Sequence, residues 1–209
     1  MIGAREALDR LREGNRRFVS GAWDVASLAT RTRRMVLAES QEPFAIILGC
    51  SDSRVPAEIV FAQGLGDLFV IRVAGNIVAS SQIGSVEFAA EQFGTRLIVV
   101  LGHSMCGAVL ATLEELERPT GNRSPHLRSI VERIRPSVEG LLATELRHSP
   151  DHLVREAVRA NIRAAASQLR HGSAILEDLS QREGLRVVGG EYSLETGVVD
   201  FFDGLPDGS

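Results

Sequence analysis

Residues 97–106 read LIVVLGHSMC, and this stretch decides the fold. Its apolar half is short and rich in β-branched side chains, which is typical of a strand buried on both faces of a parallel sheet. Two similar apolar runs occupy residues 44–48 and 68–73. A helical pattern over about residues 83–93 separates the second run from the third, which makes a βαβ unit. The sequence therefore predicts a parallel sheet with crossover helices.

Apolar periodicity assigns the remaining segments. Helices are expected near residues 3–18, from about Leu28 to Ser40, after about Ser104, across 127–142 with a kink or break at Pro136, and over 154–169. Two last strands are expected at residues 185–189 and 198–202, with GGEYSLETG between them as a hairpin region.

The predicted fold class is α/β. A mostly parallel central β-sheet of four to five strands is flanked by helices, with N-terminal helices extending from the core. We expect a single domain over residues 1–209, composed of an N-terminal helical arm at 1–41 and an α/β core at 42–209.

The bulk composition excludes several classes of function. A net charge of −4 is too small to indicate a nucleic-acid partner or an anionic membrane surface. No stretch approaches the ~20 consecutive apolar residues that a membrane span needs, and the charged N-terminus lacks the apolar segment of a secretory signal. The sequence contains no Lys, which excludes Schiff-base chemistry. A cytoplasmic protein without a membrane partner is the resulting expectation.

The two cysteines of the chain both follow predicted strands. Cys50 lies just beyond the first strand and His103 just beyond the third. Because the carboxyl ends of parallel strands meet at one edge of a sheet, these two residues can become neighbours. Cys106 follows three residues later at the entry to a helix, whose N-terminus favours a thiolate. These three ligands suit tetrahedral Zn²⁺ and leave one position open for water.

Other interpretations of these residues exist. The two cysteines can be small buried thiols beside a core histidine. A disulfide is disfavoured because the N-terminus does not read as a secretory signal and because the chain is large enough to form its own core. Asp52 and Arg54 follow Cys50 closely. The carboxylate can be a fourth ligand, a base or an orienting acceptor that Arg54 holds by a charge-assisted contact, or the two can be an exposed surface pair.

The segments CSDSRV at 50–55 and GHSMCGAV at 102–109 resemble the paired motifs of the β-carbonic anhydrases. The resemblance covers roughly residues 4–203 and includes ALDRLREGNRRFVSG, GDLFVIRVAGNIV and GSVEFAAEQFGTRLIVVLGH. It implies zinc-dependent, reversible hydration of carbon dioxide to bicarbonate and a proton through a zinc-bound hydroxide. Cys50, His103 and Cys106 match the zinc ligands, and Asp52 and Arg54 match the catalytic dyad.

The resemblance also implies a substrate pocket with features of a plant-like subgroup. Gln41 matches a glutamine that hydrogen-bonds substrate, and Gly107 matches a glycine whose N–H faces substrate. Phe69 and Ala74 fall where that subgroup lines an apolar pocket, and Phe88 takes the place of a tyrosine.

A second subgroup of the family has a regulatory bicarbonate site built from Trp, Arg and Tyr. Arg72 and Tyr192 match two of its members, but Ile47 stands at the Trp position, and the one tryptophan of the chain is Trp23. This departure puts a regulatory site in doubt.

The family further implies self-association into homodimers or homotetramers and a switch at zinc. When the pair with Arg54 breaks, Asp52 can turn onto zinc and close the site. With two thiolates on the metal, activity should rise from neutral toward alkaline pH. Two rivals share the same residues, namely a carbon disulfide or carbonyl sulfide hydrolase and a non-catalytic zinc or redox-sensing protein.

Overall fold

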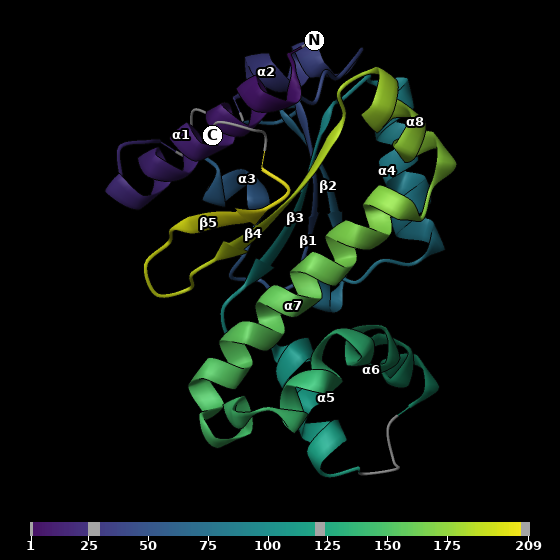
Figure 1. The fold of residues 1–209 in the computed structure, drawn as a ribbon. Coiled ribbons are helices and arrows are strands. Elements are labelled where there is room, and N and C mark those ends of the chain that lie inside the picture. The colour runs from purple at the N-terminus through teal and green to yellow at the C-terminus, as the bar shows by residue number, and fades with distance from the viewer. Residues whose placement is uncertain (1, 25–29, 120–123, 206–209) are drawn as a thin grey trace.

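The computed structural model describes residues 2–24, 30–119 and 124–205 and has an α/β architecture (Figure 1). One sheet of five strands has the order β2-β1-β3-β4-β5. Strands β1 to β4 are parallel, and β5 runs antiparallel to β4. The strands are β1 (Ala45–Gly49), β2 (Leu68–Arg72), β3 (Leu97–His103), β4 (Arg186–Tyr192) and β5 (Val199–Asp203).

Helices connect and cover these strands. The α-helices are α1 (Ala4–Ser20), α2 (Arg31–Leu37), α3 (Ala57–Val60), α4 (Ser80–Gln92), α5 (Gly107–Glu117), α6 (Pro125–Val138), α7 (Pro150–His171) and α8 (Ala174–Arg182). Short 3₁₀ helices lie at Ala74–Asn76, Glu139–Ala143 and Glu145–His148. Among the described residues, no helix combines the length and the apolar character that crossing a bilayer requires.

The predicted strands are confirmed, with shifts at their ends, but β2 is an edge strand and only partly buried, where burial on both faces was expected. Every residue of β1 and β3 is buried, which agrees with the uniform apolar runs that predicted them. Strand β3 extends through His103, two residues beyond the predicted end, because its backbone stays in register with β4 up to Tyr192. The hairpin expected between the last two strands is confirmed by the antiparallel pairing of β4 with β5.

Several predicted helix ends were wrong. Helix α5 begins at Gly107 rather than near Ser104, since two turn residues and Cys106 intervene. Helix α2 begins at Arg31, where the Thr30 side chain caps it, and the first two residues of the predicted helix lie outside the described residues. Helix α6 continues through Pro136 and ends at Val138.

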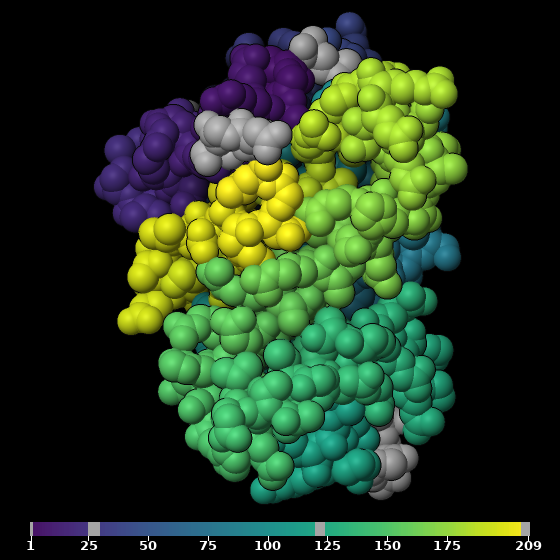
Figure 2. Space-filling view, viewed as in Figure 1, coloured from purple at the N-terminus to yellow at the C-terminus, as the bar shows by residue number. Residues whose placement is uncertain are grey.

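Two apolar cores lie on opposite faces of the sheet. Helices α4 to α8 pack on one face with side chains such as Ile46, Val100 and Ile162. Helices α1 and α3 pack on the other with Leu8, Ile47 and others. The long helix α7 crosses the first face diagonally, α4 and α8 lie beside it, and α5 and α6 lie beyond the end of the strands (Figure 1). In the space-filling view, α7 lies between α8 above and α6 below (Figure 2). The apolar side of α1 therefore faces the sheet of its own chain.

Candidate metal centre

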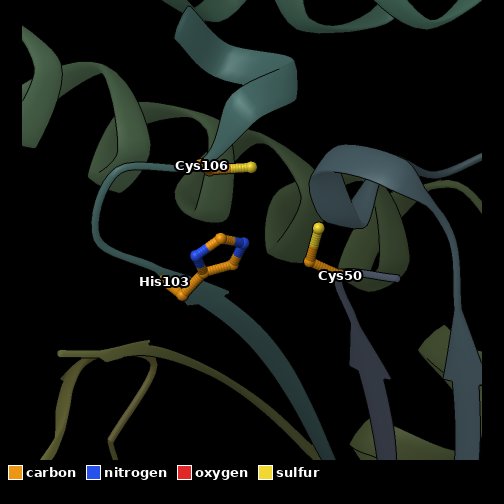
Figure 3. A group of neighbouring side chains, drawn as sticks. All are labelled: Cys50, His103 and Cys106. Atoms are coloured by element: carbon orange, nitrogen blue, oxygen red, sulfur yellow. The ribbon is translucent and has the colours of Figure 1, made fainter. Parts of the chain in front are cut away.

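Three ligand-bearing side chains meet at the carboxyl edge of the sheet. Cys50 directly follows β1, His103 is the last residue of β3, and Cys106 is the N-cap of α5. Strands β1 and β3 are direct neighbours, with Gly49 paired to Leu101. One ligand atom from each of the three side chains lies within 4.8 Å of the others, and all three residues are buried. Figure 3 shows the three side chains pointing into one space between their elements.

The turn between His103 and Cys106 explains their three-residue spacing. Met105 adopts a positive φ of 55°, which reverses the chain before α5 begins. The turn is fixed to the neighbouring hairpin, because Ser104 N–H donates to the Tyr192 carbonyl at 2.9 Å and the Ser104 hydroxyl accepts from Leu194 N–H at 3.0 Å. A left-handed residue, rather than the first turn of a helix, therefore brings Cys106 back to His103.

The imidazole of His103 is arranged as a metal ligand. Its Nδ1 lies 2.9 Å from the Ser104 carbonyl, which assigns the proton to Nδ1 and leaves the lone pair on Nε2. That Nε2 is buried and has no hydrogen-bond partner within the described part of the chain. A buried nitrogen without a partner is costly unless something binds it. An imidazole nitrogen and two cysteine thiolates are the donors that Zn²⁺ prefers, so the residues fit this metal.

The two thiols share negative charge unequally. The hydrogen bond from Cys106 is the main cause that lowers the pKa of Cys50, and contacts with His103 and the backbone N–H of Gly75 lower it further against the effect of burial. The same hydrogen bond, together with burial, raises the pKa of Cys106. In the metal-free chain, the hydrogen bond between the two sulfur atoms therefore favours the thiolate on Cys50.

Asp52 stands beside the ligands in a fixed orientation. Its Oδ2 lies 3.8 Å from His103 Nε2. The guanidinium of Arg54 donates to both carboxylate oxygens, at 2.9 Å to Oδ1 and 2.7 Å to Oδ2, and the Arg54 main-chain N–H donates to Oδ1 at 2.9 Å. These hydrogen bonds hold the pKa of Asp52 well below its usual range. In this structure the carboxylate is therefore turned to Arg54.

Two of the expected substrate residues lie at this same edge. Gly107 is the exposed first residue of α5, and open space surrounds the position that a Cβ would take. The N–H groups of a helix's first turn have no partner inside the helix and are available to a ligand. Ala74 is half-buried and adjoins Gly75, whose N–H contacts Cys50 Sγ.

The other three expected substrate residues lie at the opposite edge. Gln41 is exposed and precedes β1, so the length of the strand separates it from Cys50. Phe69 pairs with Ile46 near the amino end of the sheet. The ring of Phe88, 53% exposed, lies 6.2 Å from that of Phe69. Within one chain, these three residues are not brought to the metal centre.

Phe93 was not predicted as a member of this group. Its ring centroid lies 5.9 Å from that of Phe69 and 5.7 Å from that of Phe88, which completes an aromatic cluster at the amino edge. The five-residue spacing between Phe88 and Phe93 gives no helical or strand pattern, so the sequence carried no signal for this cluster.

The residues matched to a regulatory bicarbonate site have other contacts here. Ile47 is fully buried in an apolar core and offers no polar group. Arg72 donates from Nε to the Cys50 carbonyl at 3.0 Å and from Nη2 to the Asp52 carbonyl at 2.6 Å. Tyr192 is buried with its ring 6.4 Å from that of Phe18. Arg72 therefore holds the loop that carries both Cys50 and Asp52.

The fold and these contacts define a class of protein. A mostly parallel sheet flanked by helices holds three buried nitrogen and sulfur ligands at its carboxyl edge, with an oriented carboxylate beside them. Three protein ligands with room for a fourth are typical of a catalytic zinc site rather than a structural one. The chain is therefore a metalloprotein of the α/β class with a site of the catalytic type.

Comparison with known proteins identifies the family. The family model described as carbonic anhydrase matches residues 45–199. Carbonic anhydrase 2 of Mycobacterium tuberculosis (strain CDC 1551 / Oshkosh) is 40% identical over 190 residues, which cover 90% of this chain and 87% of the relative. A carbonic anhydrase of Mycolicibacterium smegmatis is 41% identical over 201 residues, 94% of this chain and 92% of the relative.

A solved structure agrees with these relatives. The β-carbonic anhydrase CcaA is 28% identical, with a TM-score of 0.76, over 94% of this chain and 95% of that one. The chain belongs to the carbonic anhydrase family, in its β class.

Proposed function

We propose that this protein catalyses the reversible hydration of carbon dioxide to bicarbonate and a proton, with Zn²⁺ held by Cys50, His103 and Cys106. One observation carries the proposal: the buried, unpartnered Nε2 of His103 lies beside two cysteine sulfur atoms and 3.8 Å from the oriented carboxylate of Asp52. Zinc bound at such a site supplies a water that is acidic enough to react near neutral pH. The names of the mycobacterial relatives support the same reaction.

Asp52 orients the reacting water in this proposal. Its pKa is held well below its usual range, mainly by the hydrogen bonds from Arg54, so the carboxylate is charged at every working pH and accepts a hydrogen bond. Because Arg54 donates to both carboxylate oxygens, the carboxylate cannot rotate freely, and the orientation of Oδ2 relative to the three ligands is fixed. Asp52 is thus an acceptor that aims the water toward carbon, and Arg54 fixes that aim.

The main-chain N–H of Gly107 stabilises the oxygen on which negative charge develops. It belongs to the first turn of α5, next to the ligand Cys106, and no side chain obstructs it. Ala74 contributes an apolar wall on the side of Cys50, which suits a substrate without charge.

Gln41, Phe69 and Phe88 act in the site of a second copy of the chain. Their position at the amino edge of the sheet, with the Phe88 ring 53% exposed, supports this arrangement, because no rotation of a side chain spans the length of β1. In a pair of chains related by two-fold symmetry, each contact between the copies occurs twice. The amino edge of each copy can therefore complete the site of the other. The protein is then an obligate homo-oligomer, a dimer or a tetramer.

The proposed compartment is the cytoplasm. Metal binding requires both cysteines to be reduced, and both are free in this structure. Reducing compartments maintain that state. Fractionation of the native source cells tests this location directly.

The decisive experiment for the reaction is stopped-flow hydration of carbon dioxide by zinc-loaded protein, by protein stripped with a chelator, and by stripped protein given zinc again. We expect activity to be lost with the metal and to return with it. Release of sulfide from carbon disulfide or carbonyl sulfide, without hydration of carbon dioxide, would assign the protein to the rival hydrolase. Stoichiometric zinc without turnover at any pH would assign it to the non-catalytic rival.

A further inference from the structure

A buried amide connects helix α7 to the metal centre. Asn161 is 3% exposed and lies among apolar residues of α7 such as Val158 and Ile162. A polar side chain in such a place is costly unless it is hydrogen-bonded. Its Nδ2 donates to the Gly75 carbonyl at 2.8 Å, across 86 positions of sequence. The amide therefore has a specific partner, and that partner adjoins the ligands.

Gly75 in turn contacts a metal ligand. Its main-chain N–H donates to Cys50 Sγ at 3.4 Å in a buried setting. Hydrogen bonds to a ligand atom set its orientation and its charge, and such outer contacts influence how tightly a metal is held. The chain of contacts thus runs from Asn161 through one glycine residue to the sulfur of Cys50.

The conformation of Gly75 makes its hydrogen bond to Cys50 depend on a partner that fixes the Gly75 backbone. Its φ is +70°, and a Cβ would stand 2.8 Å from Ile134 Cδ1 and 2.9 Å from the Ala108 side chain, so only glycine fits. Glycine is also the residue with the greatest backbone freedom. Without a partner on its carbonyl, Gly75 can rotate its N–H away from Cys50.

We propose that Asn161 is a positioning residue of the metal centre, which holds Gly75 so that its N–H donates to the Cys50 sulfur. This inference rests on the proposed metal site at Cys50, His103 and Cys106. It assigns a supporting role in metal binding to α7, a helix that lies outside both family motifs. The Asn161 side chain does not touch the metal or the substrate. It acts through the backbone of one turn.

The chain offers a matched control in Asn15. This residue is 5% exposed, and its Nδ2 donates to two carbonyls, those of Val60 at 3.1 Å and Gly197 at 2.9 Å. It lies on α1, which packs on the other face of the sheet. Replacing Asn15 by Ala removes a buried amide of the same kind without affecting the turn at Gly75.

The first experiment compares the zinc affinity of Asn161→Ala, Asn15→Ala and the parent protein by competition with a chromophoric chelator. We expect Asn161→Ala to lose about 10- to 100-fold in affinity, the usual cost of removing an outer contact of a metal site, while Asn15→Ala keeps the parent affinity. The sulfur-to-metal charge-transfer band of the cobalt-loaded protein should shift only in the Asn161 variant. Equal affinity losses in both variants, or none in Asn161→Ala, would overturn the proposal.

A second measurement needs no substitution and therefore does not depend on whether a variant folds. In protein loaded with spin-active cadmium, the Gly75 amide proton should show a scalar coupling to the metal through Cys50 Sγ. Metal binding without this coupling refutes the role of Asn161 and leaves the metal centre intact. Failure of the parent protein to bind zinc or cadmium would instead refute the centre itself, so the two failures are distinguishable.

Discussion

Asp52 and Arg54 form a bidentate ion pair in which each guanidinium donor meets its own carboxylate oxygen, Nε with Oδ1 at 2.9 Å and Nη2 with Oδ2 at 2.7 Å. The main-chain N–H of Arg54 adds a third hydrogen bond to the same carboxylate. The two residues are only two positions apart, so one tight turn contains the whole pair. Their geometry leads to the first three predictions.

Replacing Asp52 by Asn keeps the shape of the side chain and removes its charge. We expect turnover of carbon dioxide to fall by about 100- to 10,000-fold, the range over which a positioned proton acceptor contributes to rate. Zinc content should stay at the parent value, because the three ligands are untouched. Near-parent turnover by a fully zinc-loaded Asp52→Asn protein would refute the assigned role.

Replacing Arg54 by Ala removes the guanidinium that donates to both oxygens of the Asp52 carboxylate. We expect Asp52 to turn toward the metal and to close the fourth position. In cobalt-loaded Arg54→Ala protein, added azide should then change the visible spectrum much less than in the parent. The double variant with Asp52→Asn serves as the control and should respond to azide again. An undiminished azide response in the single variant would exclude the closed state.

The ion pair also predicts how stability depends on pH. Arg54 lowers the pKa of Asp52 in the folded protein, chiefly by hydrogen bonding, below the value of about 3.9 in an unfolded chain. A group of this kind stabilises the folded state fully above its unfolded pKa, and the contribution disappears as the pH falls through the folded pKa.

In metal-free protein, the difference in free energy of unfolding between the parent and Asp52→Asn should therefore shrink as the pH falls from about 5 to below about 4. Urea unfolding of both proteins across this range measures it. A difference that already changes between neutral and mildly acidic pH would assign the titration to another group.

Mixed oligomers test whether two chains share each site. Cys50→Ser lacks a metal ligand, and Gln41→Ala lacks the proposed substrate contact. In a hetero-oligomer of these two variants, the metal of one chain meets the intact Gln41 of the other. Random mixing should restore activity to about a quarter of the parent value, because half of the pairs are mixed and each contains one complete site. Isolated hetero-oligomers no more active than the single variants would show that Gln41 does not act across the interface.

Oxidation separates the enzyme from the redox-sensing rival. The Cys50 and Cys106 sulfur atoms lie within 4.8 Å of each other, and a disulfide requires about 2.05 Å between them. We expect metal-free protein to form this disulfide under mild oxidant, while zinc-loaded protein keeps both thiols because the metal occupies their lone pairs. Free-thiol counts before and after treatment measure the difference. Release of zinc and loss of both thiols from the loaded protein would favour the sensor.

The sequence by itself determined the sheet and the ligand set. Uniform apolar runs marked the buried parallel strands, and Cys50 and His103 followed two of them. Since parallel strands end at a common edge, their convergence needed no knowledge of the rest of the chain. The pairing of Asp52 with Arg54 could be anticipated for a different reason. The two residues lie within a single turn, so their contact depends on local geometry.

Only the tertiary structure decided which other residues support the metal ligands and where in the fold those residues lie. Met105 takes a left-handed conformation because the neighbouring hairpin holds Ser104. Gln41 and Phe88 lie at the far edge of the sheet because β1 leads from Gln41 toward the metal centre, and α4 leads back from that end of the sheet to Phe88. No pattern in the sequence indicated a role for Asn161. Its partner Gly75 lies 86 positions away, and the path of α7 across the sheet, which depends on packing over the whole core, is what brings them together.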